Sequence, residues 1–319
     1  MRALITGGAG FIGSHLADRL LGRGDQVILL DDLSTGRLTN IEHLNDRTDT
    51  EFVLGSVLNA DLVDHVASKV DVVYHLAAAV GVNLIVEKPL ESLMTNIRGT
   101  ETVIEKAHKY GKRTLVMSTS EIYGKNTSDS LSEDDDRILG SPLKSRWSYS
   151  EAKAIDEILA YTYWREKGLE TVIIRLFNTV GPRQTGSYGM VIPRFVGQAL
   201  KNQPITIFGD GTQTRCFSHV SDIVDGSLAL SEHPEAFGKV FNLGGNQEIS
   251  IGDLARMVIG LAGSDSELEY IPYDAAYEEG FEDMTRRVPD TTRARELVGF
   301  ESSINLEDII RSVIDDQRT

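Results

Sequence analysis

Short apolar runs alternate with longer amphipathic segments through the first half of the chain. Runs that are apolar throughout are typical of strands buried on both faces of a sheet. The segments between them repeat apolar residues with a helical period, most clearly over residues 90–110 and 149–167. This alternation predicts an α/β fold built on a doubly wound parallel sheet. The expected strands are Arg2–Thr6, Gln26–Leu30, Phe52–Leu54, Val72–Leu76, Leu115–Ser118 and Val172–Leu176.

The pattern changes after Asn178, where glycines and prolines cluster. We therefore predict one domain over residues 1–178 and a smaller C-terminal substrate-binding domain over residues 179–319. Val240–Leu243 is a further apolar run, which predicts that a segment near 217–243 returns to the first domain. The other elements expected in this half are a helix over Met190–Leu200, a strand over Ile205–Phe208 and a helix from Ser250 to Gly260.

Three glycines, Gly7, Gly10 and Gly13, follow the first expected strand and lead into a helix. Glycines at such a turn let the backbone approach a pyrophosphate at the N-terminus of the helix. Asp31 and Asp32 end the next expected strand, where an acid accepts hydrogen bonds from the adenosine ribose. The same acid disfavours a 2′-phosphate. The arrangement predicts a Rossmann-type site that binds NAD in preference to NADP.

Tyr149 and Lys153 lie four residues apart, so a helix places them on one face. A phenol is a poor base at neutral pH because its pKa is near 10. Half ionisation near pH 7 requires a shift of roughly 3 units, or about 4 kcal/mol. An ammonium beside the phenol favours the phenolate, and a second cation such as oxidised nicotinamide would add to that effect. The pair therefore indicates a base that works with a redox cofactor.

Composition narrows the class of protein. Of the 319 residues, 41% are hydrophobic and 25% are charged, as in ordinary globular proteins, and no apolar run is long enough to span a bilayer. The net charge of −16 argues against nucleic acid as the main partner. Cys216 is the only cysteine, which is typical of the reducing cytoplasm, and we interpret it as a buried small residue. The histidines His15, His75 and His219 lack metal-ligand spacing and predict no metal site.

Motifs along the whole chain resemble those of the extended short-chain dehydrogenases that modify nucleotide sugars. One departure is Ser56, where the family usually has an aspartate beside the adenine. The matching stretches are Thr-Gly-Gly-Ala-Gly-Phe-Ile-Gly (6–13), His-Leu-Ala-Ala (75–78), Asn-Ile-Arg-Gly-Thr (96–100), Ser-Thr-Ser-Glu-Ile-Tyr-Gly (118–124), Tyr-Ser-Glu-Ala-Lys (149–153), Arg-Leu-Phe-Asn-Thr-Val-Gly-Pro-Arg (175–183), Gly-Asp-Gly-Thr-Gln-Thr-Arg (209–215) and Arg-Arg-Val-Pro-Asp (286–290).

The resemblance assigns roles to individual residues. It implies a catalytic set of Thr119, Tyr149 and Lys153, in which Tyr149 takes the proton of the sugar 4-hydroxyl and Thr119 hydrogen-bonds the same oxygen. The residues expected at NAD are Gly7, Gly10, Phe11, Ile12, Gly13, Asp31, Asp32, Ser56, Ala77, Asn96, Tyr149 and Lys153. The residues expected at a UDP-sugar are Ser120, Asn178, Arg215 and Arg287.

Three functions compete. Glu121, Trp147 and the run 286–290 resemble the UDP-glucuronate decarboxylases. This resemblance implies that Glu121 and Arg287 help to orient the C5 carboxylate, protonate C5 and return the hydride. Val288, where a lysine is frequent, and a short loop over 186–191 favour instead a 4-epimerase acting on UDP-glucuronate or UDP-glucose. A non-catalytic NAD-sensing protein is the third reading, and such proteins typically lose the tyrosine or the lysine that this chain keeps.

Two expected helices also carry apolar stripes. In related enzymes such a pair forms a four-helix interface, although an intramolecular core explains the stripes equally well. The sequence therefore also suggests a homodimer. The stripe residues are Leu90, Leu93, Met94, Ile97 and Ile104 on one helix and Ile155, Ile158, Leu159 and Tyr163 on the other.

Overall fold

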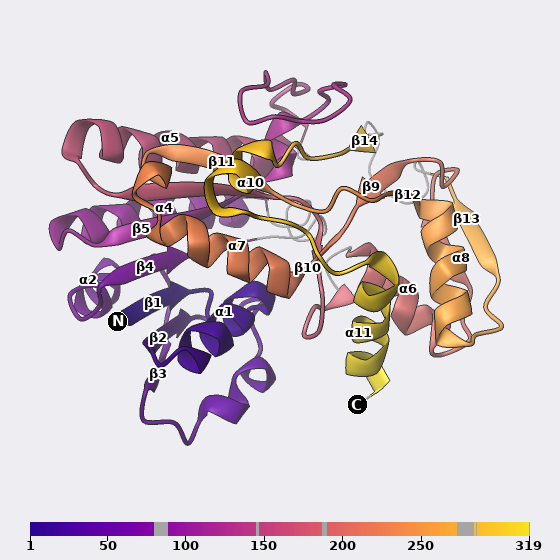
Figure 1. Ribbon diagram of the computed structural model, residues 1–319, viewed down its shortest axis with the longest axis horizontal. Helices are drawn as coiled ribbons and strands as arrows, with labels where there is room; N and C mark the ends of the chain where they lie inside the picture. The colour runs from indigo at the N-terminus through magenta and orange to yellow at the C-terminus, as the bar shows by residue number, and fades with distance from the viewer. Residues whose placement is uncertain (80–88, 145–146, 187–189, 273–283, 285, 319) are drawn as a thin grey trace.

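A computed structural model describes residues 1–79, 89–144, 147–186, 190–272, 284 and 286–318. Its centre is a seven-stranded sheet in which every neighbouring pair of strands is parallel (Figure 1). The doubly wound α/β fold is thus confirmed, and residues 239–243 form an edge strand of this sheet. In sheet order, the strands are β11 (Lys239–Leu243), β6 (Thr171–Leu176), β5 (Arg113–Thr119), β4 (Val72–His75), β1 (Arg2–Thr6), β2 (Gln26–Asp31) and β3 (Thr50–Leu54).

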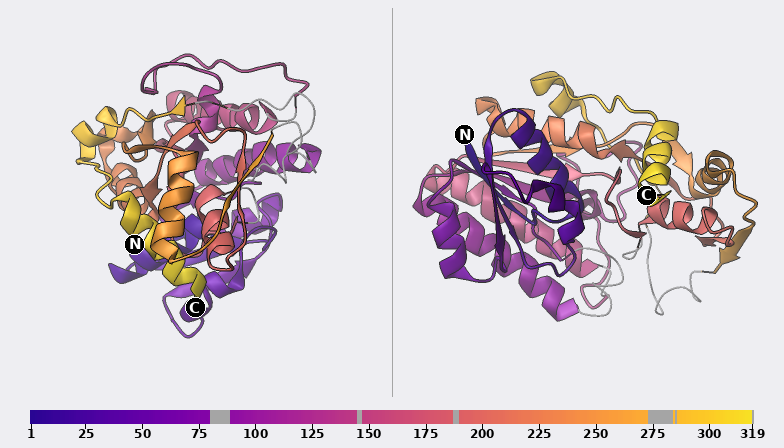
Figure 2. Two further views of the ribbon diagram at one scale, coloured as in Figure 1. Left: turned by 90° about the vertical axis from the view of Figure 1, so that its right-hand side faces the viewer. Right: turned by 90° about the horizontal axis from the view of Figure 1, so that it is seen from below.

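Helices lie on both faces of the large sheet (Figures 1 and 2), and alternate residues of the strands belong to the cores on the two faces. On β1, Ala3 and Ile5 join a core with α1 (Phe11–Gly22) and α7 (Val220–Glu232). Leu4 between them joins a core on the opposite face. This alternation explains why the strands are apolar throughout. The helices of that opposite face are α2 (Ala60–Ala67), α4 (Pro89–Lys109) and α5 (Ser148–Lys167).

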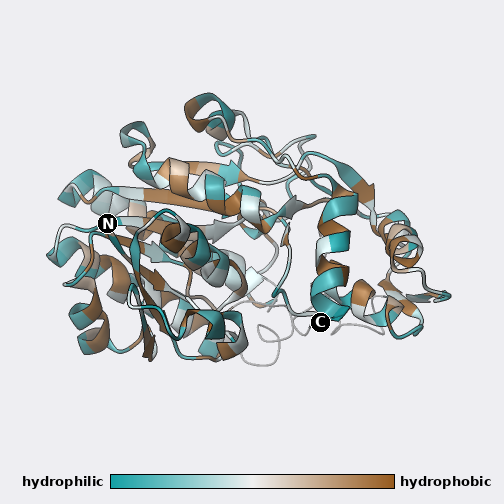
Figure 3. Cartoon of the chain, turned by 60° about the horizontal axis from the view of Figure 1, so that its bottom comes forward, coloured by the Kyte–Doolittle hydropathy of each residue, from teal (hydrophilic) through white to brown (hydrophobic). Residues whose placement is uncertain are grey.

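A separate hydrophobic core lies in the second half of the chain, at the right of Figure 1. At the start of helix α8 (Ile251–Ala262), the Ser250 hydroxyl accepts a hydrogen bond from Asp253 N and caps the helix. Figure 3 shows that the helices carry both hydrophilic and hydrophobic residues, as expected for helices that cover a core. The elements around this core are α6 (Val191–Ala199), β8 (Ile205–Phe208), α8 (Ile251–Ala262), β13 (Leu268–Ile271) and α11 (Leu306–Arg318).

Short strands connect the two parts. Parallel β7 (Thr179–Val180) and β10 (Ser218–His219) form one pair. A second small sheet has β9 in its centre, antiparallel to β12 and parallel to β14. Its strands are β12 (Glu248–Ser250), β9 (Thr214–Cys216) and β14 (Arg286–Arg287).

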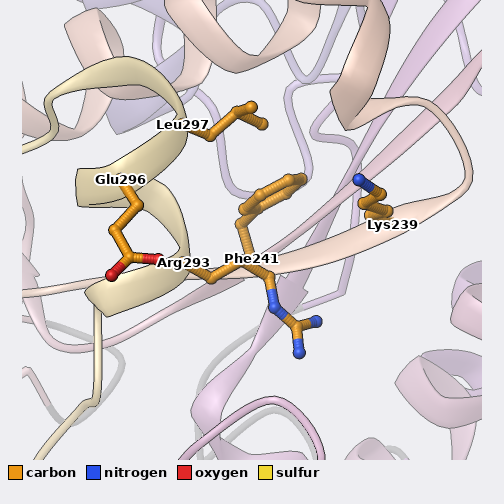
Figure 4. Close-up of a pocket in the computed structure, with 5 residues that line it drawn as sticks. All are labelled: Lys239, Phe241, Arg293, Glu296 and Leu297. Carbon is orange, nitrogen blue, oxygen red and sulfur yellow. The ribbon is translucent and has the colours of Figure 1, made fainter.

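Helix α10 (Thr292–Val298) closes the edge of the large sheet beside β11. Ala294 of this helix packs into the core that contains α1 and α7, although it lies in the second half of the chain. A cavity of about 490 Å³ remains between α10 and β11, and Figure 4 shows the side chains around it. None of the predicted site residues lines this cavity. Its lining residues are Lys239, Phe241, Arg293, Glu296 and Leu297.

The strand order reverses between β1 and β4. In open α/β sheets, ligands bind outside the carboxyl ends of the strands at such a switch point. The glycine loop follows β1 and the Thr119 region follows β5, so both predicted halves of the site lie at this edge. Among the described residues, no helix is long and apolar enough to cross a membrane.

Candidate active site

The glycine loop between β1 and α1 packs so closely against neighbouring backbone that a side chain would not fit at Gly7 or Gly13. Gly7 has a φ of +72°, and a Cβ atom there would lie 2.9 Å from Ala77 N. A Cβ atom on Gly13 would lie 2.1 Å from Gly7 O. Helix α1 begins after Gly10 without a side-chain cap and has no acid in its first turn. Its N-terminal N–H groups are therefore suited to a pyrophosphate, and the loop fits NAD.

Asp31 ends β2 and supports the same loop. Its carboxylate accepts hydrogen bonds from Ala9 N at 2.9 Å and from Leu33 N at 2.8 Å. Burial raises the pKa of this carboxyl, while the backbone N–H groups oppose the shift. Asp32 is exposed and accepts a hydrogen bond from Ser34 N. Asp31 is thus fixed by the loop, whereas Asp32 adds charge at the surface.

The other residues expected at the cofactor have local roles in this structure. Phe11 and Ile12 form the start of α1 and are partly buried against the core. Ala77 N donates to the Thr6 hydroxyl, and the Asn96 side chain accepts from Ala79 N at 2.7 Å. The Ser56 hydroxyl accepts from Leu58 N after β3. Ser56 therefore shapes its own turn, and its contact with an adenine stays a prediction.

Tyr149 and Lys153 lie in the first two turns of α5, which packs against β5. The Lys153 ammonium donates to Met117 O at 2.9 Å and to Asp156 Oδ2 at 3.0 Å. Burial and the carboxylates of Glu121 and Asp156 raise the pKa of the Tyr149 phenol. We expected Lys153 to lower this pKa. That expectation was wrong for the protein alone, because burial of the phenol and the carboxylates of Glu121 and Asp156 outweigh it.

Thr119, Ser120 and Glu121 follow one another where β5 passes into the short helix η3 (Ser120–Tyr123). The Thr119 hydroxyl accepts from Glu121 N and caps this helix. In this capped helix, the Glu121 side chain contacts Arg287, which lies near the other end of the sequence. Arg287 Nη1 lies 2.5 Å from Glu121 Oε1, and both side chains are largely buried.

The other residues predicted to bind the substrate lie beside Arg287. Besides Glu121, its guanidinium donates to Ser120 Oγ at 3.3 Å and to Asn178 Oδ1 at 3.4 Å. Asn178 follows β6 and donates to Cys216 O. Arg215 is the register partner of Arg287 on the adjacent strand β9 and is itself buried. The structure therefore brings together residues from four separate stretches of sequence.

The segment that carries Arg287 is also anchored to the large sheet. Leu131 N donates to Val288 O, and Asp290 N donates to Leu131 O. Asn242 of β11 donates to both Leu131 O and Asp290 O. These bonds fix the backbone on the C-terminal side of Arg287. The 186–191 loop, which we compared with decarboxylases, lies partly outside the described residues.

Cys216 and His75 have the structural roles that the sequence suggests. Cys216 is buried, and burial raises the pKa of its thiol to about 12. His75 is hydrogen-bonded between the Thr6 and Thr100 hydroxyls. Within the described residues, no group of three or more His, Cys, Asp and Glu side chains is arranged to hold a metal ion.

Comparisons with known proteins identify the family. The model of the NAD dependent epimerase/dehydratase family matches residues 3–244. The chain belongs to this family. It is therefore an NAD-dependent enzyme that modifies nucleotide sugars, and the reading as a non-catalytic NAD sensor is wrong.

Individual members of the epimerase/dehydratase family match over nearly the whole chain. A UDP-N-acetyl-alpha-D-glucosaminuronate decarboxylase of Bacillus cytotoxicus is 39% identical over 98% of this chain and 96% of its own length. UDP-glucuronic acid decarboxylase 1 of Arabidopsis thaliana is 36% identical, over 100% of this chain and 70% of its own. The solved structure of a Bacillus cereus UDP-glucuronic acid 4-epimerase, in complex with UDP-glucuronic acid and NAD, is 30% identical. It has a TM-score of 0.89 and covers 100% of this chain and 99% of that one.

Sequence reasoning missed one residue of this site, Asp156. It lies three residues after Lys153 on α5 and is fully buried. The spacing itself was visible in the sequence, since residues three apart on a helix are neighbours. Such pairs are usually exposed, and only the packing of α4 and β5 over this face buries it.

Proposed function

We propose that the enzyme decarboxylates UDP-glucuronate through a transient 4-keto sugar. NAD, when bound, supplies the acceptor for the C4 hydride and returns that hydride at the end of the turnover. Tyr149 takes the proton of the 4-hydroxyl, and the Thr119 hydroxyl hydrogen-bonds the same oxygen. Once C4 is a ketone, the C5 carboxylate belongs to a β-keto acid. Its C5–carboxylate bond breaks, carbon dioxide leaves, and C5 takes up a proton.

The observation that carries this proposal is the position of Arg287. A guanidinium binds a carboxylate through two parallel hydrogen bonds, and Arg287 already contacts one carboxylate, that of Glu121. It lies directly beside the end of β5, where Thr119 is placed. A uronate carboxylate would share the guanidinium with Glu121. Two carboxylates on one cation favour protonation of one of them, which would make Glu121 a proton donor for C5.

The family relatives support the same substrate class. Two relatives that match almost the whole chain are decarboxylases of UDP-linked uronic acids, one with and one without a 2-acetamido group. UDP-glucuronate is the substrate we propose first. The 2-acetamido sugar is its direct competitor, since the carboxylate at C5 is common to both.

A 4-epimerase is the second candidate. The observation that favours it is the match in fold and length with the UDP-glucuronic acid 4-epimerase. An epimerase uses the same tyrosine, lysine and cofactor but keeps the carboxylate on the sugar. The alternatives therefore differ in one measurable product, carbon dioxide.

The test is incubation of the purified enzyme with NAD and a panel of UDP-sugars. The panel contains UDP-glucuronate, its 2-acetamido analogue and UDP-glucose, with carbon dioxide, product mass and NMR as readouts. Release of carbon dioxide and formation of a UDP-pentose support decarboxylation. An epimerised UDP-hexose or UDP-hexuronate, with no carbon dioxide, overturns it and supports the second candidate.

We also propose that the enzyme is a homodimer in the cytoplasm. Part of the apolar stripe on α4 and α5 is exposed, at Leu90, Ile155 and Ile158. Other stripe residues are internal: Ile104 is buried, and Leu159 and Tyr163 pack against the same core. Leu93, Met94 and Ile97 are half-buried. In a four-helix interface, α4 and α5 of a second copy would cover the exposed apolar side chains.

A further inference from the structure

Asp156 forms a buried ion pair with Lys153 and has no role in the proposed reaction steps. Its Oδ2 atom accepts from the Lys153 ammonium at 3.0 Å, and the two side chains are 0% and 3% exposed. An ammonium has three N–H groups. Two of those on Lys153 are taken by Asp156 and Met117 O, and the third is not used by any described residue. These two hydrogen bonds fix the orientation of the Lys153 ammonium and so also the direction of its third N–H group.

The second oxygen of Asp156 lies in a row of buried polar side chains. Oδ1 is enclosed and has no hydrogen bond of ordinary geometry among the described residues. Burial raises the pKa of this carboxyl, while Lys153 and the Thr100 hydroxyl oppose the shift. Thr100 hydrogen-bonds His75 Nε2 at 3.0 Å, and His75 Nδ1 hydrogen-bonds the Thr6 hydroxyl at 2.8 Å. The row thus runs from α5 across the ends of β4 and β1 to the glycine loop.

The row leaves Asp156 as the charged group at its end. His75 adds no positive charge, because burial and the nearby Lys153 ammonium lower its pKa to about 3. Lys153 is therefore the one cation that pairs with Asp156 among the described residues. Conversely, the negative charge of Asp156 offsets part of the Lys153 charge, so Lys153 stabilises a phenolate less than an unpaired ammonium would.

Burial raises the pKa of the Tyr149 phenol, and the carboxylates of Glu121 and Asp156 raise it further. On the helix of Tyr149, Asp156 is paired with Lys153, and Glu157 is paired with Arg175 of β6. Glu121 belongs to η3 and is paired with Arg287 of β14, and His75 of β4 is neutral. Of Glu121 and Asp156, only Asp156 is held next to the lysine of the catalytic set.

We propose that Asp156 is a positioning residue for Lys153: its carboxylate fixes the ammonium and keeps a negative charge close to Tyr149, so the pH range of activity depends on a side chain remote from the substrate. This role rests on the proposed function of Tyr149 as the base. It differs from a purely structural ion pair, which would affect stability and maximal rate without moving the pH profile.

The test replaces Asp156 with asparagine, which keeps the shape and an acceptor for Lys153 but removes the charge. The enzyme is loaded with NAD, and kcat/KM for UDP-glucuronate is measured as a function of pH. The rising limb of this pH profile should move about one pH unit or more to lower pH in Asp156→Asn, because the tyrosine–lysine pair then loses its proton more easily. Asp156→Glu, which restores the charge, should return the limb to its original pH. A limb that stays in place or moves to higher pH in Asp156→Asn overturns the proposal.

Glu151→Gln is the matched control. Glu151 lies on the same helix, two residues after Tyr149, but its ion pair with Arg137 is exposed and screened. Removing this charge should leave the limb unmoved. A shift equal to that of Asp156→Asn would show a general effect of net charge and would also overturn the proposal.

A readout without turnover separates this inference from the proposed reaction. Tyrosinate absorbance of NAD-loaded protein, corrected with Tyr149→Phe, reports ionisation of Tyr149 whatever the substrate is. The titration should move to lower pH in Asp156→Asn even if UDP-glucuronate is not turned over, and an unmoved titration overturns the role of Asp156. If the asparagine variant does not fold, Asp156→Ser, which is smaller and keeps an acceptor, replaces it in both measurements.

Discussion

The guanidinium of Arg287 contacts the carboxylate of Glu121, although 166 residues separate them in the chain. The contact depends on two pairings: β14 lies beside β9, and the backbone after Arg287 is bonded to Leu131. Arg287 is therefore held at the end of β5 by the small sheet and by the large sheet together. This is the position from which a cation could hold the C5 carboxylate of a uronate.

Truncation of Arg287 tests that role. Arg287→Ala should cost about 2–4 kcal/mol in transition-state binding, or roughly 30- to 1,000-fold in kcat/KM for UDP-glucuronate. Arg287→Lys should recover only part, because a point charge cannot replace the planar fork. Affinity for UDP, measured by calorimetry, should stay close to that of the wild type.

Arg286→Ala is the control for this experiment. Arg286 is the neighbouring residue on β14 but is exposed and paired with Glu248. Its loss should change kcat/KM little. If Arg287→Ala instead weakens UDP binding as much as turnover, the arginine binds a phosphate, and the carboxylate role is wrong.

Asp31 should set the preference for NAD. A 2′-phosphate would meet a buried carboxylate that the backbone holds in place, so we expect NADP to bind roughly tenfold more weakly or worse. Asp31→Asn should narrow the difference in affinity between NAD and NADP. Asp32→Asn, at an exposed position, should narrow this difference less. Dissociation constants for both cofactors decide this, and equal affinities in the wild type would contradict it.

Removing the phenol hydroxyl should remove the base. We expect Tyr149→Phe to lose roughly 100- to 10,000-fold in kcat while UDP-sugar affinity stays nearly intact. Lys153→Met should lower activity and move the rising limb of the rate profile to higher pH, opposite to Asp156→Asn. Tyr161→Phe changes an exposed tyrosine of the same helix and should have no effect. Substantial activity of Tyr149→Phe at neutral pH would exclude this tyrosine from the mechanism.

Local pattern was enough to predict the sheet, and it also gave the candidate site residues, whose roles stay predictions. Each predicted strand of residues 1–178 is present, because buried strands leave a short apolar run that needs no knowledge of its neighbours. Gly7 and Asp31 were recognisable for a similar reason, since strand, glycine turn and acid follow one another within one βαβ unit. The division into domains stays a prediction.

Geometry between distant segments was not predictable. Glu121 and Arg287 were both expected in the site, yet their direct contact depends on the pairing of β14 with β9. The shift in the pKa of Tyr149 was predicted in the wrong direction, because the sequence shows that Lys153 is near but not that the phenol is buried or that a buried Asp156 pairs with the lysine. Burial of a charge is a property of packing, and no local pattern specifies it.

The dimer prediction concerns the exposed stripe of α5. Ile158 is 61% exposed in the single chain, and Ile158→Glu should place a charge in the interface and shift the protein from dimer to monomer. Leu54→Glu is the control, since Leu54 is 65% exposed at the end of β3, away from this helix pair. Sedimentation at micromolar concentration measures both. A wild-type mass near 35.1 kDa would contradict the dimer.

The last prediction concerns acid stability and the buried histidine. The pKa of His75 is lowered from 6.5 to about 3 in the folded protein, so between these values the unfolded chain binds the proton and the folded protein does not. The stability that depends on neutral His75 is fully present above pH 6.5 and is lost as the pH falls toward 3. Between pH 6.5 and pH 5 this loss amounts to about 2 kcal/mol. His75→Gln, which can still hydrogen-bond Thr6 and Thr100, should lose less stability over that interval by about the same amount. His65→Gln, at an exposed position, should follow the wild type. Urea unfolding at the two pH values measures the difference, and equal losses in wild type and His75→Gln would show that His75 is not the group that titrates.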